Sequence, residues 1–273
     1  MTLSLTRSVF PAGFPVSCID VSSNNDLYIG GGGGPNRSGI KNKIIVVKIN
    51  EDLKDFTLIS QLEFGNDEDA PTCLSLHPKA RSFFFSFLFF ILLTQPPPSP
   101  SFFFLKFITF DPKGFVLCSG SSDGTLSVLN YPSLKPRFPN LKASQDLLSA
   151  DFSYNSKLLA VVTKLELLVI NSNNGTKVQI INEPKTSSGE NVVFRSLKFG
   201  NSPRTQNRLY TALNSIKKKD SYITVWNTKE WSKVKTKFIS NSPITCLCQS
   251  FDGDLLAVAT ANMEIIVMDS FLT

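Results

Sequence analysis

The chain has 273 residues, of which 42% are hydrophobic, enough for one large all-β domain or two smaller ones with a substantial core. Its net charge of +6 does not indicate a nucleic-acid partner, because Lys and Arg are scattered and the one dense run, 217–219 beside Asp220, is typical of a solvated hairpin tip. Five cysteines without a Cys-x-x-Cys pair argue against a disulfide scaffold and a zinc cluster, so we expect a reduced, cytosol-facing domain.

A run of five glycines, which begins at Gly30, lies between two predicted strands at 27–29 and 44–47. A hairpin needs only one or two glycines, so this run predicts positive φ angles or a close approach of the backbone. A P-loop is excluded because Ile40 replaces its lysine, and no Gly-x-Gly-x-x-Gly frame for a dinucleotide exists. What remains is a loop rich in backbone carbonyls, which suits a hard cation.

These glycines, followed by Ile40-x-Asn42-x-Ile44, resemble the Sec12 family, whose animal members are the prolactin regulatory element-binding proteins. In that family the motif forms the first inter-strand loop of a seven-bladed propeller. The resemblance implies guanine nucleotide exchange on the Sar1-type small GTPase that starts COPII coat assembly at the endoplasmic reticulum. In this chain it implies GTPase contact by Asn42, Ile40 and Ile44. It also implies a potassium ion held by the backbone carbonyls of Gly31, Gly32, Gly33 and Gly34.

Self-similar units with a period near 40 residues follow, which is typical of a propeller built from four-stranded blades. The clearest unit spans 107–130, where a hairpin turn at 122–125 precedes the alternating Leu126 and Val128. Trp226-Asn227 stands where WD40 repeats place Trp-Asp. Further units start near Leu148, Phe194 and Pro243. We therefore expect an all-β, WD40-like β-propeller over residues 1–273, with about five recognisable units.

Residues 81–106 interrupt the second unit after a predicted first strand at 72–76. Their apolar part, 83–93, reaches about 16 Å as a helix, which is too short for a hydrocarbon core of about 30 Å. The Phe, Ser, Leu and Pro residues that dominate the segment are those with pyrimidine-rich codons. We hypothesise that 81–106 is a retained intron.

The end of the sequence also differs from the family pattern. Units after Ser270, and an apolar run of about 20 residues that would form a membrane anchor, are absent from it. The resemblance implies attachment to the cytosolic face of the endoplasmic reticulum through such a C-terminal anchor. Without it, we expect either a truncated chain or a soluble cytosolic product.

Covalent catalysis is not expected, because no nucleophile or paired-acid motif occurs and the single histidine, His77, is interpreted as a turn residue before a proline. Asp123 and Asp252 are interpreted as turn caps. The equivalent cysteines of three units are interpreted as small core residues: Cys18, Cys73 and Cys246. Two functions remain open. The first is the exchange factor, and the alternative is a non-catalytic WD40 scaffold that binds peptides or proteins in vesicle trafficking.

Overall fold

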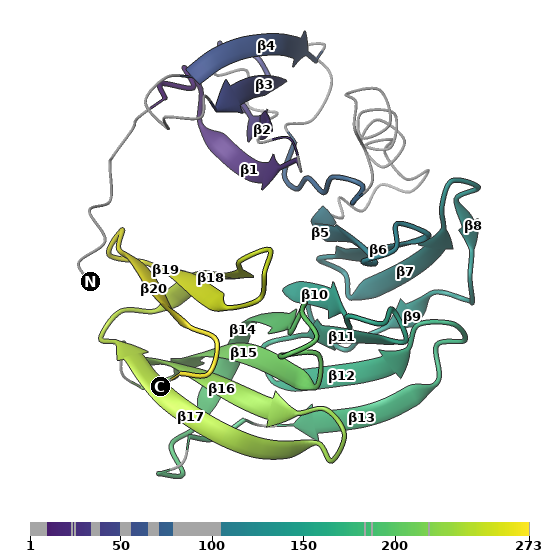
Figure 1. Cartoon of the computed structure of the whole chain (residues 1–273), viewed down its shortest axis with the longest axis vertical. Coiled ribbons are helices and arrows are strands. Elements are labelled where there is room, and N and C mark those ends of the chain that lie inside the picture. The colour runs from purple at the N-terminus through teal and green to yellow at the C-terminus, as the bar shows by residue number, and fades with distance from the viewer. Residues whose placement is uncertain are drawn as a thin grey trace. The chain divides into compact units, whose positions relative to one another are not determined.

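The computed structural model describes residues 10–22, 24, 26–33, 39–49, 56–64, 71–78, 105–182, 184–186, 188–217 and 219–272. These residues form twenty β-strands and no helix (Figure 1). Within this described part, therefore, no helix is long and apolar enough to cross a bilayer. The chain divides into two compact units, Met1–Ile108 and Thr109–Thr273, and each is described by itself.

The first unit contains one four-stranded antiparallel sheet with the order β1-β2-β3-β4. Its strands are β1 (Val16–Val21), β2 (Asp26–Gly31), β3 (Lys43–Ile49) and β4 (Phe56–Glu63). The two strands predicted at 27–29 and 44–47 are confirmed as the centres of β2 and β3. Their inward side chains Ile29, Ile45 and Val47 form a small core with Phe14.

The strand predicted at 72–76 is wrong, since residues 71–77 have no strand assignment. Leu76 donates its backbone N–H to the side-chain Oδ2 of Asp20 (2.7 Å), and Thr72 Oγ1 donates to the carbonyl of Leu105 (3.2 Å). A strand requires a ladder of backbone partners, whereas this segment is held by side-chain hydrogen bonds. The apolar alternation that predicted the strand marks burial of single residues such as Cys73.

The next sheet has the order β5-β6-β7-β8, and β9 also pairs with β7. Its strands are β5 (Leu105–Phe110), β6 (Val116–Ser121), β7 (Thr125–Asn130), β8 (Lys135–Pro136) and β9 (Leu141–Lys142). β5 takes in the last two residues of the predicted insert 81–106. Residues 81–104 lie outside the described part, so their origin as a retained intron stays a prediction.

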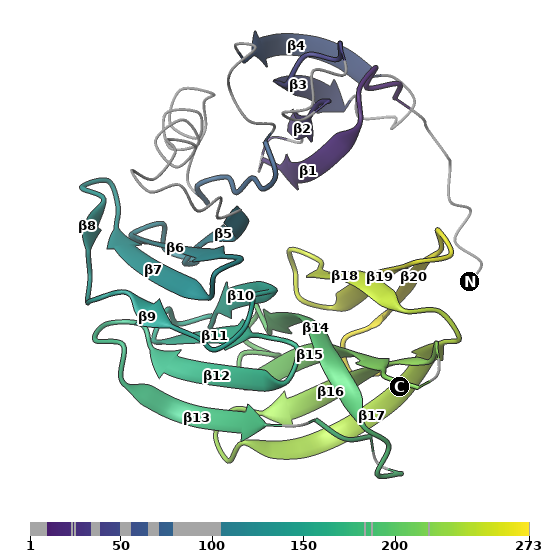
Figure 2. The same cartoon turned by 180° about the vertical axis from the view of Figure 1, so that it is seen from behind.

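Two four-stranded sheets and one three-stranded sheet follow, each a simple antiparallel meander (Figure 2). The first consists of β10 (Ser149–Phe152), β11 (Leu158–Val162), β12 (Glu166–Asn171) and β13 (Lys177–Asn182). The second consists of β14 (Val192–Phe199), β15 (Arg208–Ser215), β16 (Ser221–Asn227) and β17 (Ser232–Ser240). The third consists of β18 (Ile244–Gln249), β19 (Leu255–Thr260) and β20 (Ile265–Asp269).

These sheets confirm the units predicted from Leu148, Phe194 and Pro243, and the fold class is the predicted one, an all-β WD40-like propeller of about five units. Turn chemistry explains the hairpins. Gly124 has a φ of +82°, which a side chain disfavours, and Asp123 Oδ1 accepts the backbone N–H of Thr125 (3.0 Å). Asp252 accepts the N–H of Asp254 in the same way (3.1 Å), so both aspartates cap turns as predicted.

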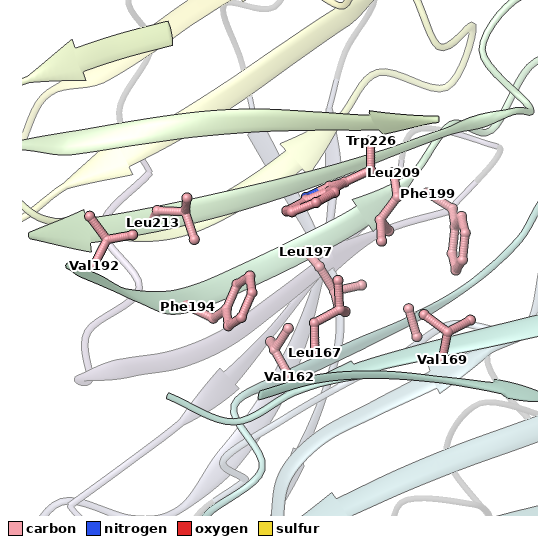
Figure 3. Packing of buried hydrophobic residues seen from close by; sticks show 11 residues of the cluster. Val162, Leu167, Val169, Val192, Phe194, Leu197, Phe199, Leu209, Leu213 and Trp226 are labelled. Atoms are coloured by element: carbon pink, nitrogen blue, oxygen red, sulfur yellow. The ribbon is translucent and has the colours of Figure 1, made fainter. Parts of the chain in front are cut away.

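One core of the second unit lies between the sheets β10–β13 and β14–β17. Figure 3 shows Leu167 and Val169 on one side facing Phe194, Leu197 and Phe199 on the other, all buried. Trp226, at the end of the third strand of its sheet, is buried beside them, and its Nε1–H donates to Thr211 Oγ1 (2.9 Å). The tryptophan of the predicted Trp-Asp-like position is therefore a core residue with a satisfied ring N–H.

Polar side chains tie neighbouring sheets together through the first strand of the following sheet. Asp151 of β10 accepts the backbone N–H of Phe199 in β14 (2.8 Å). Asn214 of β15 donates to the carbonyl of Ile244 (2.9 Å) and accepts its N–H (2.8 Å), which fastens β18 to the preceding sheet. The interfaces between these sheets thus combine apolar packing with specific hydrogen bonds.

The cysteine prediction is correct for Cys73, which is buried, but wrong for Cys246, which is exposed. Cys18 is half-buried. In β18 the core position belongs to Leu247, which is 2% exposed, and strand alternation turns its neighbours to the opposite face. The predicted hairpin tip around Lys217 and Lys219 is confirmed, since both are exposed between β15 and β16.

Candidate functional site: the β2–β3 loop

The glycine run does not lie wholly in the loop. Gly30 and Gly31 are the last residues of β2, where they pair with Ile44 and Lys43 of β3. The connection itself is 32–42, and residues 34–38, which include the predicted potassium ligand Gly34, lie outside the described part. The loop is therefore the turn of a long hairpin whose stem is set by the β2–β3 register.

Close packing explains why three of these positions are glycine. A Cβ on Gly31 would lie 2.0 Å from the carbonyl oxygen of Pro15, and one on Gly30 would lie 2.7 Å from Sγ of Cys18. A Cβ on Gly32 would lie 2.3 Å from Oδ1 of Asn42, and the φ of Gly32 is +149°. The close backbone approach expected from the sequence is present at all three positions.

Backbone hydrogen bonds fix both ends of the loop. Gly32 donates its N–H to the carbonyl of Pro15 (3.0 Å), just before β1. Phe64, just after β4, donates its N–H to the carbonyl of Asn42 (2.8 Å). Within the loop, the N–H of Gly33 reaches the carbonyl of Ile40 (3.3 Å). The loop thus projects from anchors at both edges of the sheet.

The three residues predicted to contact a GTPase differ in exposure. Ile40 is 43% exposed, Asn42 is 6% exposed and Ile44 is 3% exposed. Ile44 faces the interior from β3, and Asn42 packs its side chain against Gly32. In this conformation Ile40 is the one of the three that offers its side chain to a partner. The contact role of all three residues stays a prediction.

Two lysines flank Asn42. Lys41 forms an ion pair with Glu63 of β4 (Nζ to Oε2, 2.6 Å), and this hydrogen bond holds the pKa of Glu63 below its usual value. Lys43 places its ammonium 5.0 Å from the centroid of the Phe14 ring, a cation–π contact. The charge of Lys41 is therefore balanced by Glu63, and Lys43 is the lysine of the two that lies over an aromatic ring.

Sequence reasoning missed Val16, the first residue of β1. It pairs with Gly31 at the end of the hairpin stem, and it is 51% exposed. Its neighbour Pro15 supplies the carbonyl that anchors Gly32. Val16 thus places a second exposed apolar side chain at the end of the sheet from which the loop projects. The register of β1 on β2, which the sequence alone did not provide, is the signal that identifies it.

The predicted potassium site has only partial support in the geometry. Gly31 is paired on both sides, with Val16 and Lys43, so the sheet fixes the direction of its carbonyl. The buried side-chain oxygens without a partner in the described residues all belong to the second unit. No three His, Cys, Asp or Glu side chains cluster in the part of the chain that is described. Potassium binding by 31–34 stays a prediction, and no step proposed below depends on it.

No family model matches the chain. It is 26% identical over 163 residues to the SEC12-like protein 2 of Arabidopsis thaliana, an alignment that covers 60% of this chain. The chain spans only 40% of the length of that relative. Among solved structures, it is similar to a chain in the crystal structure of the mitotic checkpoint complex, with a TM-score of 0.68 at 14% identity. That match covers 95% of this chain and 76% of the other, and it supports the fold alone.

Proposed function

We propose that this protein is a guanine nucleotide exchange factor for a Sar1-type small GTPase, and that it acts in COPII coat assembly at the endoplasmic reticulum. The observation that carries the proposal is the similarity to the SEC12-like protein 2, taken together with the Gly-rich and Ile-x-Asn-x-Ile motif on a β2–β3 hairpin. A hairpin loop on a β-sheet support is a common position for a partner-binding site.

The loop has the features of a pre-organised contact. Its ends are hydrogen-bonded to Pro15 and Phe64. At the glycines of the hairpin stem, neighbouring atoms lie so close to the backbone that a Cβ atom would not fit. A partner therefore meets a loop whose ends are already ordered, and less ordering entropy opposes binding. Ile40 is the apolar contact of the proposal, and Lys43 near it favours an acidic surface on the GTPase.

We assign Asn42 a positioning role. Its carbonyl accepts from Phe64, and its buried side chain packs on Gly32, so it shapes the turn that presents Ile40. Exchange follows from linkage. A loop that binds the nucleotide-free GTPase more tightly than the loaded form lowers the affinity for nucleotide by the same factor. A tenfold loss of nucleotide affinity requires a difference of about 1.4 kcal/mol between the free energies of binding to the two states, which a few contacts of this kind supply.

A non-catalytic scaffold is the second candidate, and the burial of Asn42 and Ile44 favours it. Without a rearrangement of the loop, two of the three residues of the motif do not reach a partner. A scaffold needs only a stable surface. It binds the nucleotide-free and nucleotide-loaded states of a GTPase with equal affinity, or it binds another trafficking protein. Such binding shifts no nucleotide equilibrium.

Nucleotide release separates the two candidates. The GTPase is loaded with a fluorescent guanine nucleotide, and its dissociation into excess unlabelled nucleotide is followed with and without the chain. The exchange factor accelerates release by about tenfold or more at saturation. The scaffold binds the GTPase without changing the rate. A small GTPase of another family serves as the control, and a repeat in potassium and then lithium tests the predicted cation.

A further inference from the structure

The outermost strand of the sheet β10–β13 has an open edge. In the part of the chain that the structure describes, β13 (Lys177–Asn182) pairs with β12 and with no other strand (Figure 2). The sheets on either side of this one belong to the same unit. Asp151 of β10 accepts the N–H of Phe199 in β14. On the other side Arg137, just after β8, donates to Asn173 in the β12–β13 turn (2.8 Å). These neighbours leave every residue of β13 exposed or half-buried.

The sequence of β13 favours pairing with a further strand. It reads Lys-Val-Gln-Ile-Ile-Asn, in which valine and isoleucine are strong strand formers and Lys177 is the one charged residue. Val178 and Ile180 are 44% and 39% exposed. Six-residue segments with high β-propensity, low charge and no proline are the segments that add another strand when they lie at an open edge.

The two neighbouring sheets protect their own outer edges. β8 and β9 have two residues each, and Pro136 of β8 has no N–H to donate. β17 carries three lysines, and its pairing with β16 shifts register twice. Short strands, prolines, lysines and bulges are devices that keep sheet edges from pairing. The pairing of β13 with β12 shifts register once, beside Val178, and residues 179–182 are paired regularly. That part of β13 has none of these protective features.

We propose that the edge of β13 binds a second copy of this chain, so that two β13 strands pair antiparallel and join two four-stranded sheets into one sheet of eight strands. A two-fold axis perpendicular to the sheet keeps each side chain on its own face, so it must pass through a residue pair. Centred on Ile180, it places Ile180 opposite its own copy. Gln179 then lies opposite Ile181, and Val178 lies opposite Asn182.

Charge and symmetry both favour this antiparallel pair. The two Lys177 ammonium groups lie at opposite ends of the paired strands, six residue steps or about 20 Å apart, whereas a parallel pair would bring them together. Each copy contributes the same edge, so the contact closes at a dimer and does not continue into a fibre. One strand edge buries less than the roughly 1,200 Å² typical of stable complexes, so we expect a dissociation constant on the order of 10 µM.

The test is sedimentation velocity of the full chain at about 1 to 100 µM, a range that spans this dissociation constant. The wild type should pass from monomer to dimer and form nothing larger. Ile180→Lys should weaken dimerisation by about tenfold or more, since it removes an apolar pair and places two like charges opposite each other. Val234→Lys is the matched control, because Val234 is 59% exposed in the edge strand β17, and it should dimerise like the wild type. Thermal unfolding verifies that both variants fold.

A mixture of the Ile180→Lys and Ile180→Glu variants tests the register. Each variant alone repels its own copy, whereas a mixed pair places an ammonium opposite a carboxylate. The mixture should therefore form dimers at concentrations where each variant alone is monomeric. A wild type that stays monomeric, as expected if another segment of the chain covers this edge, would overturn the proposal. So would assemblies larger than a dimer, equal behaviour of Ile180→Lys and Val234→Lys, or no dimer in the mixture.

Discussion

Gly32 is the position of the β2–β3 loop where any side chain meets both backbone and side-chain atoms. Its φ of +149° disfavours other residues, and a Cβ would lie 2.5 Å from the Cα of Asn42. We expect Gly32→Ala to destabilise the hairpin by on the order of 2 kcal/mol. Amide hydrogen exchange in β2 and β3, measured by mass spectrometry, should then become about 30-fold faster.

Gly39→Ala is the control for this substitution. Gly39 also has a positive φ, +79°, but a Cβ there meets no atom within 4 Å. Gly39→Ala therefore has the conformational cost of a positive φ but no steric clash. Its effect on amide hydrogen exchange in β2 and β3 should be clearly smaller than that of Gly32→Ala. Equal effects of the two substitutions would contradict the view that close approach to Asn42 is what requires glycine at 32.

Asp123 makes the stability of its hairpin depend on pH. Burial raises the pKa of its carboxyl, but hydrogen bonds from Lys142, Ser121 and Thr125 outweigh this and hold the pKa well below its usual value. Because the pKa of Asp123 is lower in the folded state than its value of about 3.9 in the unfolded state, the ionised carboxylate stabilises the fold at any pH above about 3.9. This contribution is lost as the pH falls from about 3.9 toward the folded-state pKa.

We therefore expect Asp123→Asn to lower stability by about 1 kcal/mol at neutral pH. Its difference from the wild type should shrink as the pH is lowered from about 4. Urea unfolding midpoints of both proteins across this range measure the effect. A difference that stays constant down to acid pH would show that the carboxylate charge contributes nothing.

At the scale of elements, Asn214 holds the sheet β18–β20 to its neighbour. Its amide makes two hydrogen bonds to the backbone of Ile244. Asn214→Ala leaves a buried N–H and a carbonyl without partners, which costs about 2 kcal/mol. We expect amides of β18 to β20 to exchange about 30-fold faster, with β10 to β13 unchanged. Asn214→Asp keeps the oxygen that accepts the Ile244 N–H, so this control variant should have a smaller effect. Equally faster amide exchange in all sheets would instead indicate global unfolding and would contradict the local role of Asn214.

Strands with a clear apolar alternation and a turn signal were predictable from sequence, as β6, β7 and the hairpin at Gly124 show. The segment 72–76 has the same pattern but no strand, because pairing depends on a partner that local sequence does not specify. Cys246 was misplaced for a related reason. Its exposure depends on which face of β18 is covered, and that is decided by packing with β15 and β16.

The candidate site was predictable in position but not in detail. The glycine motif marked the β2–β3 loop, and the loop is there. The burial of Asn42 and Ile44, and the exposure of Val16 beside the stem, depend on the sheet register and the path of residues 10–16. A sequence motif locates the loop, whereas the exposure of its side chains to a partner is determined by the tertiary packing.

At the scale of the whole molecule, repeated antiparallel sheets provide the stable support and one unusual loop provides the proposed activity. Neighbouring sheets of the second unit share apolar cores and are joined by hydrogen bonds such as that from Phe199 to Asp151. The first unit holds its loop from both edges of its sheet. We propose that Ile40, which this loop presents, is the central apolar contact in nucleotide release from a Sar1-type GTPase.

The most direct test is stopped-flow nucleotide release with the wild type, Ile40→Ala and Ile59→Ala. Ile59 is the matched control, an isoleucine of β4 that is 52% exposed in the same unit. We predict that the wild type accelerates release, that Ile59→Ala does so equally, and that Ile40→Ala loses about tenfold of the acceleration, as expected for loss of a central apolar contact worth roughly 1.4 kcal/mol. Full acceleration by Ile40→Ala, or none by the wild type, would contradict the claim.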